Sequence, residues 1–470
     1  MHTYSDRRCA LLVTYRPRHW ILHRPAWSVA TRGIDDMAEG SSGKWNVPQL
    51  EFKEIVGTNV RFLYVFGNII PEFRTKGQTV WYLVYAVTFV GSIYVSMLTS
   101  EVINMVVVMG DLEKMTEASF LALTHMIQVG KLYYIYKYRN RLGSLIKSID
   151  RYEFRPRSIY QYNTLKEYIR DSKRITNTFL SACVVTCAFW SLYPFTVEEE
   201  LRLPLAGWYP FDTSKSPAFE ITFVYQAVAS TINGLSNICL DTLMSGLIMV
   251  VCAQFNILND SLKNLREYSK DELDVNARFR KEMSVELQNK MDEKLWECVV
   301  HHRYILEYAF QFASEVTFLF TYSILGQFIV SVIIICITLF EITLLPWGSL
   351  KFFSLILYQL CMLLEIFLLC YYGNKVIVES MELTKCAYHD DWIDCSTKFK
   401  RNLLFFMTRS QVPLKLTAGG FFTLSLDTFV KASLHIGTSY GSHLTCLPFQ
   451  ILKSSYSYFA VLNRVHSKKI

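Results

Sequence analysis

Charged residues are scarce in this chain of 470 residues, because Asp, Glu, Lys and Arg make up 19% of it, against about 25% in a soluble domain. Hydrophobic residues make up 51%, and no stretch rich in Pro, Gly and Ser divides the chain into separate domains. The net charge of +7 is modest and unevenly distributed, in a pattern typical of a membrane protein and not of a nucleic-acid-binding one. This composition excludes an ordinary soluble enzyme and indicates an integral membrane protein in a lipid bilayer.

Motifs that carry catalytic chemistry are also lacking. The sequence has no phosphate-binding glycine loop, no GxSxG motif and no catalytic triad in order. His301 and His302 are expected on a polar helix face, without Cys, Asp or Glu at metal-ligand spacing. The apolar run Cys9–Tyr15 is too short for a signal peptide and is followed by Arg and Pro. We therefore expect no enzymatic activity, no cofactor and no metal.

The 12 cysteines do not have the pattern of a disulfide framework. Most lie inside apolar segments or on their expected cytoplasmic side, and Cys446 alone is clearly expected to face outward. Cys183 and Cys187 share one face of a helix, where we interpret them as small apolar packing residues.

Several apolar runs are long enough to cross about 30 Å of hydrocarbon, which takes roughly 20 helical residues. Six segments are predicted to span the membrane: Thr79–Ser100, Ala118–Tyr136, Ile175–Val197, Ile221–Asn259, Val316–Phe340 and Phe352–Asn374. A seventh apolar region, Leu416–Val465, is irregular because charged residues interrupt it.

Three charged residues fall in or near these spans, where a charge without a partner costs at least about 2.5–3.5 kcal/mol. They are Lys131, Asp241 and Glu365. Lys131 lies near one end of its span, from which its long side chain could reach the interface. Each of the three should therefore face a partner, a cavity or the interface.

The number of Lys and Arg residues alternates between high and low along the segments that precede and connect the spans. In order, these segments hold 11, one, 12, two, nine, one and six of them. Because positive loops stay in the cytoplasm, the pattern predicts a cytoplasmic N-terminus and, after seven spans, an extracellular C-terminus. This orientation excludes a G-protein-coupled receptor, whose N-terminus lies outside. The acidic-Arg-Tyr triplet of such receptors is also missing from the inner end of the third span.

The sequence thus predicts an all-α polytopic membrane protein with seven transmembrane helices. We expect residues 1–78 to form a cytoplasmic N-terminal segment, 79–412 to hold spans one to six with cytoplasmic helical loops, and 413–470 to hold the seventh span. The loop Lys270–Arg303 has apolar residues at helical spacing, which predicts a cytoplasmic helix with one buried stripe packed against the ends of spans six and seven. The stripe is Leu287, Met291, Leu295 and Val299.

Several stretches in order resemble the insect odorant receptor family. An outer loop, a junction between spans six and seven, and a final span carry the resemblance, which is densest in the last hundred residues. The stretches are Leu203–Asp212 with Pro217 and Tyr225-Gln226; Tyr372-Gly373, Glu379-Ser380, Ala387-Tyr388 and Trp392; Arg401–Leu404, Arg409–Pro413 and Thr417–Gly420; and Ser425–Phe429 with Ile451–Phe459.

This resemblance implies a subunit of an odorant-gated cation channel in the plasma membrane. In the family, four subunits surround one pore lined by the seventh helix of each, typically as a hetero-tetramer with a shared odorant receptor co-receptor. Its ligands are volatile small molecules. The likeness extends neither to residues 1–36 nor to residues 432–450.

The resemblance also directs attention to a ligand pocket and a gate. A volatile ligand needs a mostly apolar, aromatic cavity with few polar groups, although each candidate taken singly also fits bundle packing. Val461 and Val465, one turn apart in the last span, are expected to close the pore by dewetting; the alternative is ordinary lipid-facing or interhelical valines. The expected ligand-binding residues, in the outer halves of spans two, three, four and six, are Phe120, His125, Cys183, Thr186, Trp190, Phe223, Phe353 and Tyr358.

Two alternatives have distinct signatures. A gustatory receptor of the same fold would respond to soluble tastants without a co-receptor. A transporter would show internal repeats between its halves, and the sequence shows none. Residues before Met37 are rich in Arg and lack an apolar period, so we expect Met37 to suffice as a start and residues 1–36 to be dispensable.

Residues 432–450 interrupt the last span. Joining Lys431 to Ile451 would give one helix, Leu424 to Val465, of 23 residues and about 35 Å. With the insert present, Ile451–Val465 alone has 15 residues and is roughly 22 Å long, which is too short to cross. Two glycines and Pro448 inside the insert resist a continuous helix.

We predict that deleting residues 432–450 increases the odorant-evoked current, because it restores a continuous seventh span. Recordings from cells that express the full chain or the deletion, at matched surface levels, measure this. If the deletion gives no larger current, the insert is a genuine part of the channel, in line with a substitute helix over Leu444–Val465.

Overall fold

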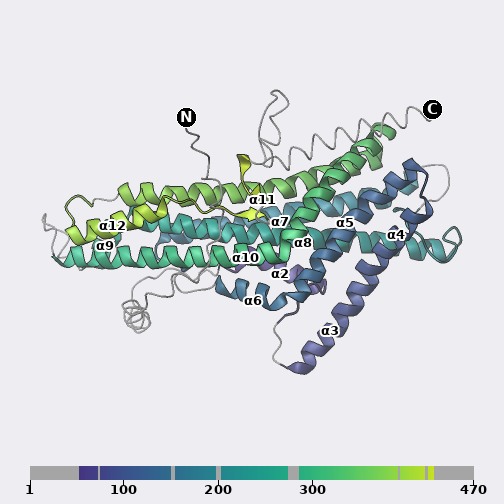
Figure 1. Cartoon of the computed structure of the whole chain (residues 1–470). Coiled ribbons are helices and arrows are strands. Elements are labelled where there is room, and N and C mark those ends of the chain that lie inside the picture. The colour runs from purple at the N-terminus through teal and green to yellow at the C-terminus, as the bar shows by residue number, and fades with distance from the viewer. Residues whose placement is uncertain are drawn as a thin grey trace, which may run out of the picture. The chain divides into compact units, whose positions relative to one another are not determined.

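A computed structural model of the chain describes residues 52–71, 75–149, 154–196, 203–273, 285–389, 392–418 and 422–427. The chain divides into two units, residues 1–48 and 49–470, and all the described residues lie in the second. Figure 1 shows that they are almost entirely helical, which confirms the helical class predicted from the sequence. The predictions on Val461, Val465 and residues 1–36 and 432–450 lie outside the described residues.

The helices match the expected segments and often extend beyond them. In chain order the elements are α2 (Glu54–Val65), α3 (Lys76–Val90), the π-helical turn η3 (Gly91–Val95), α4 (Ser96–Val107), α5 (Leu112–Lys137), α6 (Arg139–Ser148), α7 (Ile159–Leu192), the 3-10 turn η5 (Tyr193–Thr196), α8 (Ala218–Lys263), α9 (Leu265–Glu272), α10 (Val285–Leu344), α11 (Leu350–His389), α12 (Thr397–Ser410), β1 (Thr417–Ala418) and β2 (Phe422–Thr423).

Among the described residues, four helical stretches are long and apolar enough to cross a membrane. They are Lys76–Val107, Ile159–Thr196, Ala218–Lys263 and Leu350–His389, which contain the expected spans one, three, four and six almost completely. The expected spans two and five lie in α5 and α10, which are also unbroken helices. α5 is less apolar because Lys114, Glu117 and Lys131 are part of it.

The helix expected within Lys270–Arg303 is the first part of α10. This helix has 60 residues in all and continues without a break into the expected fifth span. Leu287, Met291 and Leu295 are buried, which confirms the predicted apolar stripe. The prediction of a polar face at the two histidines is wrong, because both rings are buried. His301 hydrogen-bonds to Gln254 at 2.7 Å, and burial lowers its pKa to about 3, so the ring is neutral at physiological pH.

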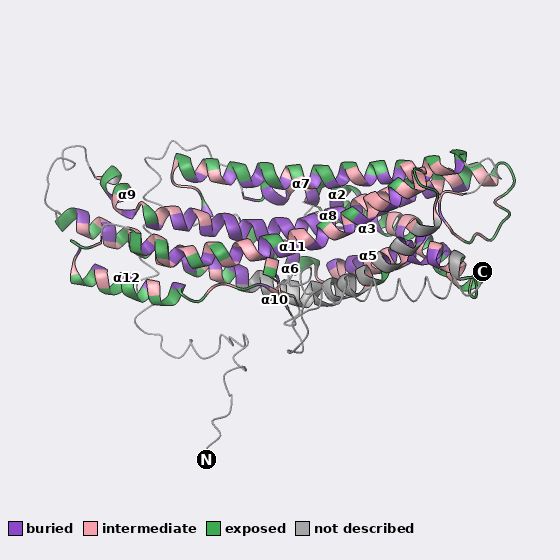
Figure 2. Ribbon diagram, turned by 90° about the horizontal axis from the view of Figure 1, so that it is seen from above, coloured by how far each residue is buried: buried purple, intermediate pink, exposed green. Residues whose placement is uncertain are grey.

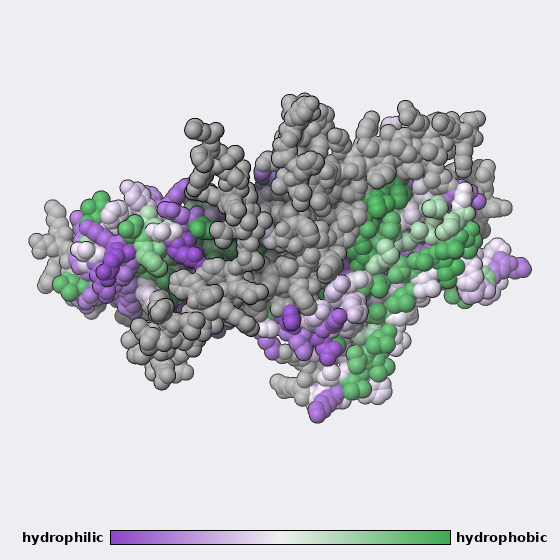
Figure 3. Space-filling model, in the orientation of Figure 1, coloured by the Kyte–Doolittle hydropathy of each residue, from purple (hydrophilic) through white to green (hydrophobic). Residues whose placement is uncertain are grey.

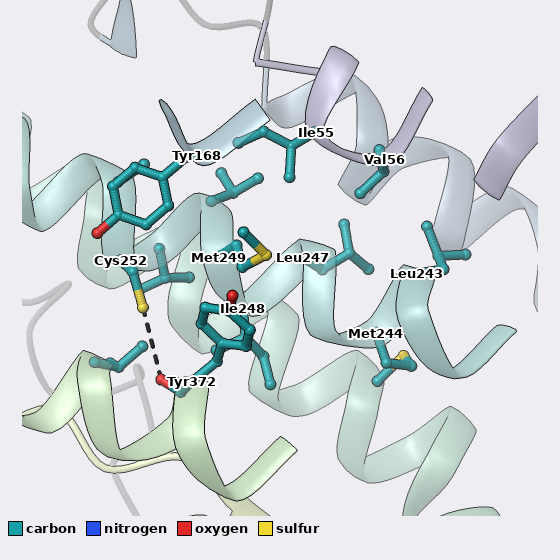
Figure 4. Close-up of a cluster of buried hydrophobic side chains, with 14 of the residues drawn as sticks. Ile55, Val56, Tyr168, Leu243, Met244, Leu247, Ile248, Met249, Cys252 and Tyr372 are labelled. Carbon is teal, nitrogen blue, oxygen red and sulfur yellow. Dashed lines mark hydrogen bonds between the residues drawn. The ribbon is translucent and has the colours of Figure 1, made fainter. Parts of the chain in front are cut away.

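α8 is the central helix of the bundle. In its most apolar stretch 94% of the residues are buried, and Figure 2 shows this buried helix flanked by α7 and α11. A helix that is apolar on all sides is stable only when other helices surround it. Figure 4 shows how they do so, with Ile55 and Val56 from α2, Tyr168 from α7 and Tyr372 from α11 packed against the residues of α8 near Leu247.

Outward-facing side chains are apolar along the first predicted span. Val80, Trp81, Val84 and Val87 of α3 are each more than half exposed. In Figure 3 hydrophobic residues form a band over this helix, whereas hydrophilic residues gather around α9 and α12. Exposed apolar helix surface of this extent indicates contact with lipid.

The two short strands bring the chain back against α11 after α12. Thr417 pairs with Thr423 in an antiparallel register, and Leu424 follows directly. A Cβ atom at Gly373 of α11 would collide with the carbonyl of Leu424, so only glycine permits this approach. The start of the expected seventh span therefore packs closely against α11.

Lys131 does not reach the membrane interface, so that sequence interpretation is wrong. Its side chain is turned toward α8, where its Nζ donates to Asp241 Oδ1 at 2.6 Å and to Asn237 Oδ1 at 3.1 Å. The Lys131 and Asp241 side chains are 3% and 10% exposed. The counter-charge on α8 stabilises the ammonium inside the bundle, so the two charges that the sequence left without assigned partners form one buried ion pair.

We predict that Lys131→Met lowers the stability of the protein by about 3–5 kcal/mol, because Asp241 then loses its counter-charge in a buried site. The double variant Lys131→Met with Asp241→Leu should recover most of this loss. The midpoint of thermal unfolding in detergent, followed by tryptophan fluorescence, measures both effects.

Lys173→Met is the matched control, because Lys173 pairs with Glu54 in a half-exposed ion pair whose loss should change stability by less than about 1 kcal/mol. A double variant as unstable as the sum of its two single variants would contradict the coupling of Lys131 with Asp241.

Candidate functional site

A cavity of about 70 Å³ lies inside the bundle between α5, α7, α8 and α11. Its wall combines aliphatic, aromatic and sulfur-containing side chains with a few polar groups. The lining residues are Leu121, Thr124, His125, Gln128, Cys183, Thr186, Cys187, Trp190, Ser230, Gly234, Asn237, Ile238, Tyr358, Cys361, Met362 and Glu365.

Five of the eight ligand-binding residues proposed from the sequence line this cavity: His125, Cys183, Thr186, Trp190 and Tyr358. Phe120 is packed next to it. The centroid of its ring lies 6.2 Å from that of Trp190 and 5.7 Å from that of Tyr358. These three aromatic rings come from α5, α7 and α11 and close one side of the cavity.

Phe223 and Phe353 are not part of the cavity. Phe223 lies in the first turns of α8 and packs against Phe195, with ring centroids 5.3 Å apart, two turns before the residues of α8 that line the cavity. Phe353 is 50% exposed. It precedes Tyr358 by five residues, which at 100° per residue places it about 140° around α11. The prediction considered the type of each residue and its depth in the membrane, but not the direction in which it faces around its helix.

Sequence reasoning also missed most of the polar wall. From α5 it found His125, but Leu121 and Gln128, one turn before and after it, and the adjacent Thr124 also line the cavity. The helical period, extended from His125, could have identified them. From α8 it missed Gly234, where a Cβ would lie 2.5 Å from Cys183 Sγ, so the glycine lets α7 approach α8 at this point.

The buried carboxylate of Glu101 binds the ring of His125. Nδ1 of His125 lies 2.9 and 2.8 Å from the two carboxylate oxygens of Glu101, and both side chains are almost fully buried. The pair joins α4 to α5. Nothing in the sequence distinguishes Glu101, because this charged residue only marks the end of the uncharged run at Ser100.

The loop Leu203–Asp212 contacts α4 next to this pair. The backbone nitrogen of Trp208 donates to the carbonyl of Ser100 at 3.1 Å, and Ser100 Oγ donates to the carbonyl of Trp208 at 2.9 Å. Ser100 is the neighbour of Glu101 in the chain. The loop therefore contacts α4 one residue away from the group that orients His125.

Glu365 is the third charged residue that the spans contain, and it lines the cavity, as expected for a residue that should face a partner, a cavity or the interface. A hydrogen bond of 2.7 Å between Thr124 Oγ1 and the Tyr358 hydroxyl joins α5 to α11 at the cavity wall. Within the part of the chain that the structure describes, no group of three His, Cys, Asp or Glu side chains has the arrangement of a metal site. A mostly apolar wall with convergent polar groups fits a small organic ligand.

Comparison with known proteins gives consistent results. The family model "7tm Odorant receptor" matches residues 111–433. Odorant receptor 46a, isoform A, of Drosophila melanogaster is 26% identical over 82% of this chain and 93% of its own length. Odorant receptor Or1 of Anopheles gambiae is 25% identical over 76% and 83%.

The fold is similar to that of the insect olfactory receptor OR5 from Machilis hrabei, whose structure was solved in complex with eugenol. The TM-score is 0.67 at 17% sequence identity, over 88% of this chain and 98% of that chain. Because the family model covers well over half of the sequence, the chain belongs to the insect odorant receptor family.

Proposed function

We propose that the chain is the odorant-binding subunit of a ligand-gated cation channel in the plasma membrane. The observation that carries this proposal is the mostly apolar cavity between α5, α7, α8 and α11 in a chain of this family. A volatile odorant enters this cavity, and binding shifts the helices around it toward the open channel.

The cavity has the chemistry that a volatile ligand requires. Trp190, Tyr358, Leu121 and Met362 supply apolar surface, and few polar groups interrupt it. OR5, which has the same fold, is described as an olfactory receptor in complex with eugenol. These points support odorant binding at five of the side chains that the sequence suggested, with Phe120 packed beside them and Phe223 and Phe353 outside the cavity.

The proposal of a channel rests on membership of the odorant receptor family and on the distribution of Lys and Arg along the chain. The alternation of Lys and Arg favours seven spans with the N-terminus in the cytoplasm and the C-terminus outside. In the proposed assembly, this chain and a co-receptor form a hetero-tetramer around one pore. Val461 and Val465 of the last span are the proposed hydrophobic gate.

The proposed site is also placed to influence the pore. α11 contributes Tyr358, Met362 and Glu365 to the cavity wall. Two turns further along the same helix, Gly373 lets Leu424, at the start of the expected seventh span, approach α11 closely. A ligand that displaces α11 would therefore move the segment that leads into the pore helix.

Filling the cavity should weaken ligand responses without changing the fold. Thr186→Phe places a large ring where Thr186 lines the cavity, and we expect the concentration for half-maximal current to rise about tenfold or more, since overpacking costs about 1–3 kcal/mol. The measurement is odorant-evoked current in cells that express the chain with an odorant receptor co-receptor, against a panel of volatile odorants.

Val184→Phe is the matched control, because Val184 lies on the same helix two residues away and is 48% exposed on the outside of the bundle. Its response should equal that of the unmodified chain at equal surface expression. Cells without the co-receptor should give no current. An unchanged half-maximal concentration in Thr186→Phe, or a response that needs a G protein, would contradict the proposed function.

A further inference from the structure

One polar side chain at the cavity lacks a hydrogen bond that its burial demands. The Nε2 of Gln128 donates to the backbone carbonyl of Asn233 at 2.9 Å. Because only the NH₂ group can donate to a carbonyl, this bond fixes the orientation of the amide. Gln128 is only 1% exposed, so water outside the bundle does not reach it. Its Oε1 accepts no hydrogen bond from any residue that the structure describes.

A buried acceptor without a donor costs about 1–3 kcal/mol, so the site is incomplete as it stands. Gln128 lines the cavity, so a molecule inside the cavity can supply the missing donor. This requirement selects molecules with an O–H or N–H donor. A ketone or an ether lacks such a donor and would leave Oε1 unsatisfied.

His125 restricts the choice further. It lies three residues before Gln128 in α5, so the two side chains are neighbours on one face of the helix, and both line the cavity. Its Nδ1 is taken by the Glu101 carboxylate, which leaves Nε2 as the ring nitrogen for a ligand. A ring protonated against Glu101 offers an N–H at this position, which requires an acceptor on the ligand.

A hydroxyl group satisfies both requirements at once, because its oxygen accepts from His125 Nε2 while its hydrogen is donated to Gln128 Oε1. A primary ammonium group donates but has no lone pair, and it would add a positive charge beside the imidazolium. The rest of the wall, with Leu121, Trp190 and Met362, accommodates an apolar chain.

We propose that this cavity selects ligands that carry one hydroxyl group on an apolar body, and that Gln128 and His125 recognise the hydroxyl. The inference rests on the proposed function of the cavity as the odorant site and names its ligand class.

Isomeric pairs of ligands test it. Butan-1-ol, hexan-1-ol and octan-1-ol are compared with methyl propyl, methyl pentyl and methyl heptyl ether, which have the same atoms but no donor. We expect the best alcohol to act at about one tenth of the concentration of its isomeric ether, the factor that corresponds to about 1.4 kcal/mol. Hexylamine should be weaker than hexan-1-ol.

The variant Gln128→Met should bring the ratio between alcohol and ether close to one, because it removes the acceptor and keeps a side chain of similar length. Gln254→Met is the control for structural damage. Gln254 is a buried glutamine that also donates to a backbone carbonyl, that of Phe154 at 3.2 Å, and it is not among the residues that line the cavity. This control should keep the ratio of the unmodified chain.

Two readouts separate this inference from the proposed channel function. Currents with the co-receptor report gating, and the ligand-induced shift in thermal unfolding of the purified full chain reports binding alone. A shift that favours alcohols without any current would support the hydroxyl site and contradict the channel. Equal action of alcohols and ethers on the unmodified chain would mean that water satisfies Gln128, and it would overturn the inference, as would stronger action of hexylamine or no binding of either series.

Discussion

The bundle depends on hydrogen bonds that join polar side chains of the buried helix α8 to neighbouring parts of the chain. Water cannot supply these bonds in the hydrocarbon region. Asp241 is paired with Lys131 of α5 at 2.6 Å. Asn59 of α2 donates to Thr242 at 2.5 Å, and Asn68 donates to Ser236 at the same distance.

These bonds determine the position of the outer helices more specifically than apolar packing does. Leucine and methionine contacts with α8 tolerate a shift along the helix, whereas a shift of one residue would separate Lys131 from Asp241. Because lipid offers no alternative partner, the pairs set the register of α2 and α5 against α8. The cavity then arises where α5, α7 and α11 meet α8 beside small side chains such as Gly234, Ser230 and Cys183.

The sequence predicted well whatever depends on the amount and order of apolar residues. The stretches of α3, α7, α8 and α11 were recognisable because each contains a long run with almost no charge, and the buried stripe at the start of α10 followed from its period. It also identified five residues of the cavity wall, since aromatic and small polar residues in the spans are suited to a volatile ligand. These inferences need no information on contacts between helices.

Other features depend on which helix faces which, and the sequence could not supply that. The partner of Lys131 lies 110 residues away, so its position near a span end suggested the interface instead. Phe353 was assigned by residue type, although its position around α11 places it outside the bundle. Gln128 appeared unremarkable in sequence, and its significance depends on a single backbone carbonyl, that of Asn233, which fixes its amide.

The central claim is that the cavity between α5, α7, α8 and α11 is the odorant site. Electron cryo-microscopy of the full chain with a co-receptor, with and without hexan-1-ol, tests it most directly. The account predicts ligand density between Gln128, Thr186 and Trp190, with the hydroxyl beside Gln128. Ligand density at another position, for example on the outer surface at Phe353, with this cavity unchanged, would contradict it.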